Sequence, residues 1–277
     1  DECSVAGIVR AHTAIKEHDL AIKLIVGSMF RLNNELQVIL LCPNRKAYAE
    51  LCRVITNARR RSEKGCYELQ EWDLMSLKHC LLIWLPSGDT SDSHWGYWLN
   101  KYHKPRVWLG MQRRLLSNDQ AYIEHCLSLA KHMQLRIAAC GGVLFHNANR
   151  LELQHTLTAI KEGKQVSELG HQRLSNAERT LRSITKLSKL FNHEWLAESF
   201  YLSELCKFKL NELRYEYPAE LVPKGKMAMT YLRELVVTGI EFRFPEGIKP
   251  EIQQTIDKEL ALIEALDYPY YFLTIHD

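Results

Sequence analysis

The fold of this chain is constrained most by short apolar runs that alternate with helix-like segments. Each run is four to six residues long and mostly aliphatic, which is typical of strands buried on both faces. The runs lie at 22–26 (IKLIV), 36–41 (LQVILL), 80–85 (CLLIWL), 106–109 (RVWL) and 135–140 (LRIAAC). Strands that alternate with helices predict an α/β fold built on a mostly parallel sheet or barrel.

Helix and turn signals fill the spaces between these runs. Ser4 is expected to cap a first helix, and a second helix is expected after Pro43. The pair Asn33–Asn34 predicts a turn between the first two strands. Together these signals support the α/β assignment for the first half of the chain.

The second half is predicted to be mainly helical. Asn149 is expected to cap a helix that ends at Gly163, and later helices are expected at 194–205, at 229–239 and from Pro250 onward. The closing run YYFLTIHD is predicted to be strand-like, and the opening DECSVAG lacks a starting methionine. We therefore expect an excerpt of a longer protein, with one domain at 1–172 and another at 173–277.

Composition narrows the class of protein. The chain has 277 residues, 46% hydrophobic and 25% charged, which is sufficient for a sizeable core, and its net charge of +3 is too small for a nucleic-acid coat protein. None of the eight cysteines forms a C-x-x-C pair, so we expect reduced thiols in a cytoplasmic protein rather than a zinc knuckle or a disulfide framework. No apolar run reaches the roughly 20 residues of a membrane helix.

The stretch IAACGGVLFHN, at 137–147, places two glycines and a histidine at a predicted strand end, where active sites of α/β folds gather. The strand-end positions considered as metal ligands are Asp1, Glu2, Met29, Gly142, Leu144 and His146. Only Asp1, Glu2 and His146 carry side chains that suit a metal, and an exposed loop histidine is the simpler interpretation of His146. No nucleotide-binding, hydrolase or metalloprotease motif is present.

Basic and aromatic clusters are candidates for nucleic-acid contacts. Arg59, Arg60 and Arg61, with Lys64, could hold DNA phosphates, although cations also suit the end of a helix. Arg113–Arg114 is a shorter pair and is expected at a solvated surface. The aromatic clusters RYEYP (Tyr215, Tyr217) and YPYYF (268–272) could stack on bases, but packing between elements is the simpler expectation.

Six ordered blocks resemble the error-prone bacterial family C DNA polymerases, relatives of the polymerase III alpha subunit. The blocks are DECSVAGIVRAH, KLIVGSMFRL, LCPNRKAYAELCRVITNARRRSEKG, LQHTLTAIKEGKQVSELG, ELRYEYPAELVPKG and ELALIEALDYPYYFLTIHD. The resemblance implies an amino-terminal polymerase-and-histidinol-phosphatase (PHP) domain, a distorted barrel, over residues 1–172. The start of the polymerase palm would then occupy 173–277.

The same resemblance implies that the metal site of the PHP barrel has been lost. Asp1 and His146 match the family's ligands, whereas Glu2 stands where many members have histidine. Met29 replaces glutamate, Gly142 replaces aspartate and Leu144 replaces histidine. We therefore expect no bound metal, and expect these positions to be vestigial.

The function implied for the parent protein is error-prone, damage-tolerant DNA synthesis on a template-primer from deoxynucleoside triphosphates, with Mg²⁺ as cofactor. The catalytic aspartates of the palm would lie outside this chain, which would serve as a non-catalytic scaffold. Accessory proteins and a sliding clamp are the expected partners. Two alternatives remain open here: a PHP-type metal phosphoesterase or proofreading nuclease, and a DNA- or protein-binding module.

Overall fold

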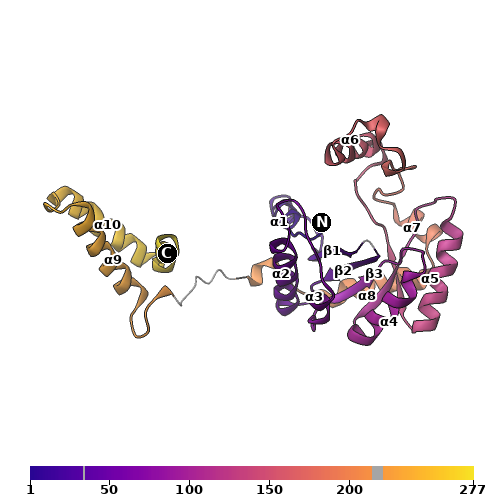
Figure 1. Ribbon diagram of the computed structural model, residues 1–277, viewed down its shortest axis with the longest axis horizontal. Coiled ribbons are helices and arrows are strands. Elements are labelled where there is room, and N and C mark those ends of the chain that lie inside the picture. The colour runs from indigo at the N-terminus through magenta and orange to yellow at the C-terminus, as the bar shows by residue number, and fades with distance from the viewer. Residues whose placement is uncertain (34, 214–220) are drawn as a thin grey trace. The chain divides into compact units, whose positions relative to one another are not determined.

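The computed structural model describes residues 1–33, 35–213 and 221–277. It divides into two compact units, Asp1–Leu213 and Arg214–Asp277, so the predicted division at residue 172 falls inside the first unit. The order of elements can be followed in Figure 1. The first unit contains α1 (Gly7–Glu17), β1 (Gly27–Leu32), β2 (Leu36–Leu41), α2 (Arg45–Arg60), α3 (Glu71–Met75), β3 (Leu81–Trp84), α4 (Ser91–His103), β4 (Val107–Gln112), α5 (Asp119–Met133), β5 (Arg136–Cys140), α6 (Leu151–Glu162), α7 (Ile184–Leu190) and α8 (His193–Leu205).

The five strands form one sheet in the order β1-β2-β3-β4-β5. β1–β2 and β2–β3 are antiparallel, whereas β3–β4 and β4–β5 are parallel. The prediction of an α/β fold is confirmed, but the mostly parallel sheet is wrong for its first half. The described strands form an open sheet with β1 and β5 at its edges, so they do not close into the predicted barrel.

The first strand lies later in the sequence than predicted. Residues 22–26 are not in a strand, and Ile22 is 62% exposed. Instead β1 pairs Leu32 with Leu36 across a short turn, where Asn33 has a φ of +51°. A connection this short permits only an antiparallel hairpin, so the residues next to the turn form the strand. The apolar run before them carries the chain toward the sheet.

Helices cover both faces of the sheet. On one face, α2, α4 and α5 contribute Leu51, Leu99 and Ile123 to a core that includes Trp84. On the other face, Leu202 of α8 packs with Ile83 and Trp108. Because successive strand side chains point to opposite faces, every residue of β3 and β4 is buried. This is why these strands appear as continuous apolar runs in the sequence.

Local signals at helix ends were predicted with mixed success. The helix predicted after Pro43 is α2, and the structure shows that Asn44 caps it, because its side chain accepts a hydrogen bond from the Ala47 amide. Gly163 ends α6 with a φ of +63°, as predicted, because this left-handed conformation favours glycine. The predicted cap at Ser4 is wrong: α1 begins after Ala6, and the carboxylate of Asp1 accepts the Gly7 amide. The predicted cap at Asn149 is also wrong: α6 begins after Arg150, and it is the Asn147 side chain that accepts a hydrogen bond, from the Asn149 amide.

The second unit is helical, with α9 (Ala228–Arg243), α10 (Pro250–Ala265) and α11 (Pro269–His276). Its core joins the three helices through Leu232, Ile263 and Leu273. Pro250 occupies the first turn of α10, as predicted. The run YYFLTIHD is helical rather than strand-like, because Pro269 opens a helix whose Leu273 packs on the other two. Tyr215 and Tyr217 lie outside the described residues.

Candidate functional site

Polar side chains collect where several strands of the sheet end. This row of strand ends, which differs from the outer strands β1 and β5, is referred to as the edge of the sheet. β3 and β4 are parallel and end together at this edge, where Ser87 and Arg114 follow them. β1 also ends there, and the antiparallel β2 begins there, with Arg31 paired to Gln37. The edge corresponds to the strand-end position where ligand sites of α/β folds occur.

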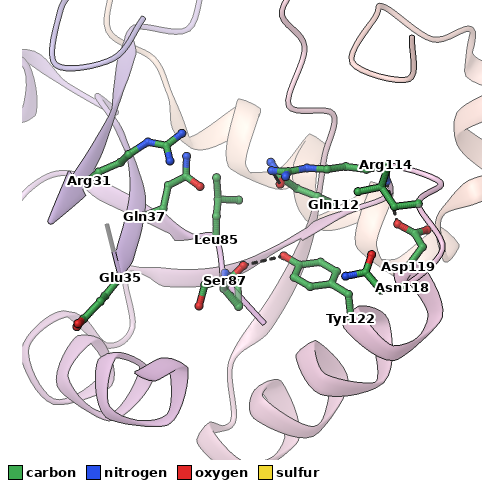
Figure 2. Close-up of a pocket in the computed structure, with 12 residues that line it drawn as sticks. Arg31, Glu35, Gln37, Leu85, Ser87, Gln112, Arg114, Asn118, Asp119 and Tyr122 are labelled. Carbon is green, nitrogen blue, oxygen red and sulfur yellow. Dashed lines mark hydrogen bonds between the residues drawn. The ribbon is translucent and has the colours of Figure 1, made fainter. Parts of the chain in front are cut away.

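A pocket of about 250 Å³ opens at this edge. Arg31, Gln37, Gln112 and Arg114 line it, together with apolar atoms of Leu85. Figure 2 shows the guanidinium groups of Arg31 and Arg114 pointing toward each other from opposite sides of the pocket. Guanidinium and amide groups that converge in this way suit an anion.

The loop after β3 is held in place by a buried carboxylate, that of Asp92. Asp92 accepts the Ser87 amide at 2.9 Å, the Ser87 hydroxyl at 3.0 Å and the Gly88 amide at 2.8 Å, and it lies 2.8 Å from Nε2 of His125. Tyr122 donates to the carbonyl of Pro86 at 3.1 Å. Ser87 and His125 both bind Asp92 rather than each other, so this group is a loop anchor and not an activated nucleophile.

A third arginine stands beside the pocket. Nε of Arg179 donates to the carbonyl of Gly142 at 2.7 Å, and the Arg179 carbonyl accepts the Leu144 amide at 2.8 Å. Burial, followed by the charges of Arg114 and Arg31, lowers the pKa of Arg179 to about 10. The positive charges of Arg114 and Arg31 therefore lie near enough to Arg179 to disfavour its charged form.

The positions predicted to be vestigial metal ligands have other partners at the amino-terminal end. The Asp1 carboxylate binds the Gly7 amide, as described above. Oε1 of Glu2 accepts the Tyr67 hydroxyl at 2.7 Å and lies 3.3 Å from Nε of Arg31. The sulfur of Met29 accepts the side-chain amide of Gln37 at 2.7 Å. These contacts place Glu2 and Met29 close to Arg31 and Gln37, two of the pocket residues.

The remaining three positions lie on the loop after β5. Gly142 has a φ of +56°, and a Cβ placed there would lie 3.0 Å from Nε2 of Gln112 and 3.7 Å from Nη2 of Arg179. Leu144 and His146 are exposed. Within the described residues, no group of three or more His, Cys, Asp or Glu side chains is arranged to hold a metal ion. The donor set at these positions does not suit the metals of a PHP site, because a thioether, a glycine and a leucine at Met29, Gly142 and Leu144 are poor ligands or none.

The basic residues at the end of α2 and just after it are of two kinds, those that hold other parts of the chain and those that are exposed and make no such contact within the described part of the chain. Arg59 donates to the carbonyls of Cys3, Gly65 and Cys66, so it holds loops together. Arg60 and Lys64 are exposed. The proposal that these residues contact DNA phosphates stays a prediction, and exposed charges are better placed for it than charges engaged in loop contacts.

Arg61 forms the tightest ion pair of this run. Nη2 of Arg61 is 2.7 Å from Oδ1 of Asp73, and Nη1 contacts the other oxygen. Burial raises the pKa of Asp73, but hydrogen bonds from Arg61 and from the Gln70 amide outweigh burial, and the pKa is lowered below its usual value. The guanidinium of Arg61 is thus committed to a structural carboxylate.

The residues of the pocket were largely missed by sequence reasoning. Arg113 and Arg114 were expected at a solvated surface, yet both are only partly exposed. Arg113 pairs with Asp119 at 2.7 Å and donates to the Leu190 carbonyl. Arg114 is the second residue after a buried strand, and this position was the available signal. Arg179 lies in a loop 65 residues after Arg114 along the chain, without a motif to mark it.

Comparison with known proteins finds similarity along the whole chain. The chain is 61% identical over 277 residues to the error-prone DNA polymerases of Vibrio vulnificus strain CMCP6 and Vibrio parahaemolyticus, and 42% identical over 279 residues to that of Methylococcus capsulatus. It spans about a quarter (26–27%) of the length of these relatives. A family model described as the bacterial DNA polymerase III alpha NTPase domain matches residues 230–277. These matches confirm the resemblance to error-prone family C polymerases.

Proposed function

We propose that the protein carrying this chain is a DNA-directed DNA polymerase of the error-prone type, because the chain is homologous to such polymerases over its whole length. Identity of 61% over all 277 residues is the observation that carries this proposal. The substrates would be a DNA template-primer and deoxynucleoside triphosphates, with Mg²⁺ as cofactor. The reaction would serve damage-tolerant DNA synthesis in the cytoplasm, and accessory proteins and a sliding clamp would recruit the enzyme.

The chain itself would act as a scaffold beside the catalytic core. Its first unit would be a PHP-type domain, built on an open sheet, that has lost its metals. Met29, Gly142 and Leu144, which are poor metal ligands or none, stand at positions where the family has ligands, and this supports the assignment. The rival function, a metal phosphoesterase or nuclease, needs ligands that these residues do not provide. Stoichiometric zinc or manganese in the purified protein, with chelator-sensitive cleavage of single-stranded DNA, would favour the rival.

Primer extension tests the polymerase proposal directly. The full-length protein should extend a primer on both an undamaged template and a template with an abasic site when Mg²⁺ is supplied. The 277-residue chain should not extend either primer, because the catalytic aspartates are proposed to lie outside it. Template-directed synthesis by the chain alone, or none by the full-length protein, would contradict the proposal.

A contribution to DNA binding is proposed for Arg60 and Lys64, since both are exposed at the end of α2 and beyond. Changing both to glutamine should remove two phosphate contacts and reduce the slope of log K against log salt by about 2. The measurement is DNA binding by the full-length protein across a salt series. An unchanged slope would remove these residues from the interface.

Among the described residues, no helix is long and apolar enough to cross a membrane.

A further inference from the structure

The pocket at the strand ends contains more positive charge than its structural contacts use. Arg31 pairs with Glu2 at 3.3 Å, and Arg113 pairs with Asp119 at 2.7 Å. Within the part of the chain that the structure describes, neither Arg114 nor Arg179 pairs with a carboxylate. Arg114 donates to the side-chain oxygen of Gln112, and Arg179 donates to the backbone carbonyl of Gly142. Two guanidinium groups thus have only neutral acceptors.

These two arginines are linked through one short cluster. The space beside Gly142 is shared by Nε2 of Gln112 and Nη2 of Arg179, at 3.0 Å and 3.7 Å from a Cβ placed on that glycine. The side-chain oxygen of Gln112 in turn accepts a hydrogen bond from the guanidinium of Arg114. Arg31 lines the pocket from β1, and its guanidinium points toward that of Arg114 from the opposite side (Figure 2). Three guanidinium groups from three separate segments therefore converge on one region.

Convergence of like charges has an electrostatic cost. The lowered pKa of Arg179, caused first by burial and then by Arg114 and Arg31, reflects that cost. Of the acidic residues that line the pocket, Asp119 is paired with Arg113 and Glu35 accepts the indole N–H of Trp95 at 3.2 Å, and among the described residues neither carboxylate forms an ion pair with Arg114 or Arg179. A bound anion would supply the missing negative charge.

The size of the pocket limits the ligand. A volume of about 250 Å³ is far above the roughly 10–15 Å³ that a single water molecule needs, so several waters or a small ligand can occupy it. A tetrahedral oxyanion with part of its hydration shell fits this space, whereas a nucleic-acid duplex does not. The adjoining amide groups of Gln37 and Gln112 can donate to further oxygens of such a ligand.

We infer that this pocket binds a phosphate group, held by Arg31 and Arg114 of its lining with the charge of Arg179 beside them, at the strand ends where a PHP metal centre would otherwise lie. The phosphate belongs to a small molecule or is inorganic phosphate. No bond is made or broken, since the pocket has no metal ligand set and no activated nucleophile among its described residues. Binding of this kind does not depend on the proposed polymerase activity.

Isothermal titration of the full-length protein with inorganic phosphate, and separately with a deoxynucleoside monophosphate and its unphosphorylated nucleoside, tests the inference. Both phosphates should bind and the nucleoside should not. Arg114→Gln should weaken phosphate binding about tenfold or more, because a charge-assisted hydrogen bond is lost. Arg10→Gln changes an exposed arginine of α1 outside the pocket and should leave the affinity unchanged.

A second arginine variant distinguishes lost phosphate binding from a variant that simply fails to fold. Arg31→Gln removes a side chain that is 46% exposed and makes one ion pair, so it should fold normally and still weaken phosphate binding. Circular dichroism melting of each variant identifies any that is unfolded. The inference is overturned by an equal loss in Arg10→Gln, by unchanged affinity in folded Arg31→Gln, by binding of the nucleoside as tight as that of the monophosphate, or by no phosphate binding in the wild type. Binding of an oligonucleotide alone overturns it as well.

Discussion

The role of each side chain in this protein depends on the residues that it contacts in the folded structure. Glu2 and Met29 were considered as remnants of a metal site, yet their contacts are with Tyr67, Arg31 and Gln37. The three adjacent arginines of α2 look equivalent in the sequence, but two of them hold loops and Asp73. Residue type therefore predicted the chemistry each side chain can perform, and did not predict which partner it has.

His103 provides a pH prediction. It is fully buried at the end of α4, and neither ring nitrogen has a partner among the described residues. Burial, followed by the charge of Arg106, lowers its pKa from 6.5 to about 4. Between these values the unfolded chain binds a proton that the folded chain does not, so this contribution is complete above pH 6.5 and is lost as the pH falls toward 4.

The loss at pH 4 should be about 3 kcal/mol of unfolding free energy. His103→Leu should flatten the dependence of stability on pH over that window, measured by urea denaturation from pH 7 to pH 4. His146→Gln, which changes an exposed histidine, should keep the wild-type dependence. A variant at His103 with the wild-type slope would show that this imidazole does not control it.

Secondary-structure elements were predicted best where one face or both faces are apolar. The strand at 36–41 was predicted at its observed bounds, and the run at 80–85 contains the whole of β3. Predictions were wrong where an apolar run fits a strand and also fits a connection or a helix. Residues 22–26 lead into the sheet instead of forming β1, and YYFLTIHD packs as a helix. Periodicity cannot separate these cases in short runs.

Two helical glycines allow a matched test of packing. A Cβ at Gly96 in α4 would lie 2.2 Å from Sδ of Met133 and 2.8 Å from Cη2 of Trp84, whereas a Cβ at Gly239 in α9 would have nothing within 4 Å. Gly96→Ala should destabilise the first unit by about 1–3 kcal/mol through overpacking. Gly239→Ala should stabilise the second unit by about 0.5–1 kcal/mol, because alanine favours helix. Denaturant midpoints measure both, and equal shifts would refute the packing argument.

At the level of the whole molecule, the chain consists of two compact units, each with a core of its own. Among the described residues the core of the second unit is the smaller, and the buried members of its hydrophobic cluster are Ala228, Leu232, Leu260, Ile263 and Leu273. It lies largely within the segment matched by the polymerase III alpha model, residues 230–277. A small core makes each of its side chains important to the stability of that unit.

Leu232→Ala should therefore lower the stability of the second unit by about 2–5 kcal/mol, through lost burial and a residual cavity. Hydrogen exchange should show faster exchange of amides in α9, α10 and α11. Phe242→Ala on the same helix is the control, since this side chain is 86% exposed and should leave exchange unchanged. Similar exchange in the two variants would mean that Leu232 does not anchor this core.

Sequence reading was sufficient for the α/β class, for the helical character of the second half, and for some helix ends, namely the start after Pro43 and the end at Gly163. These features depend on neighbours within a few residues, and apolar period, capping and turn chemistry are local. The resemblance to error-prone polymerases was also contained in the ordered motifs.

The antiparallel start of the sheet and the arginine pocket required the folded chain. Arg31, Arg114 and Arg179 are separated by 83 and 65 positions in the sequence, and they converge only when β1 and β4 occupy the same sheet and a later loop returns to its edge. Contacts at such separations are decided by strand order and chain closure, which local patterns do not encode. For this reason the chemistry of the pocket emerged from the three-dimensional arrangement.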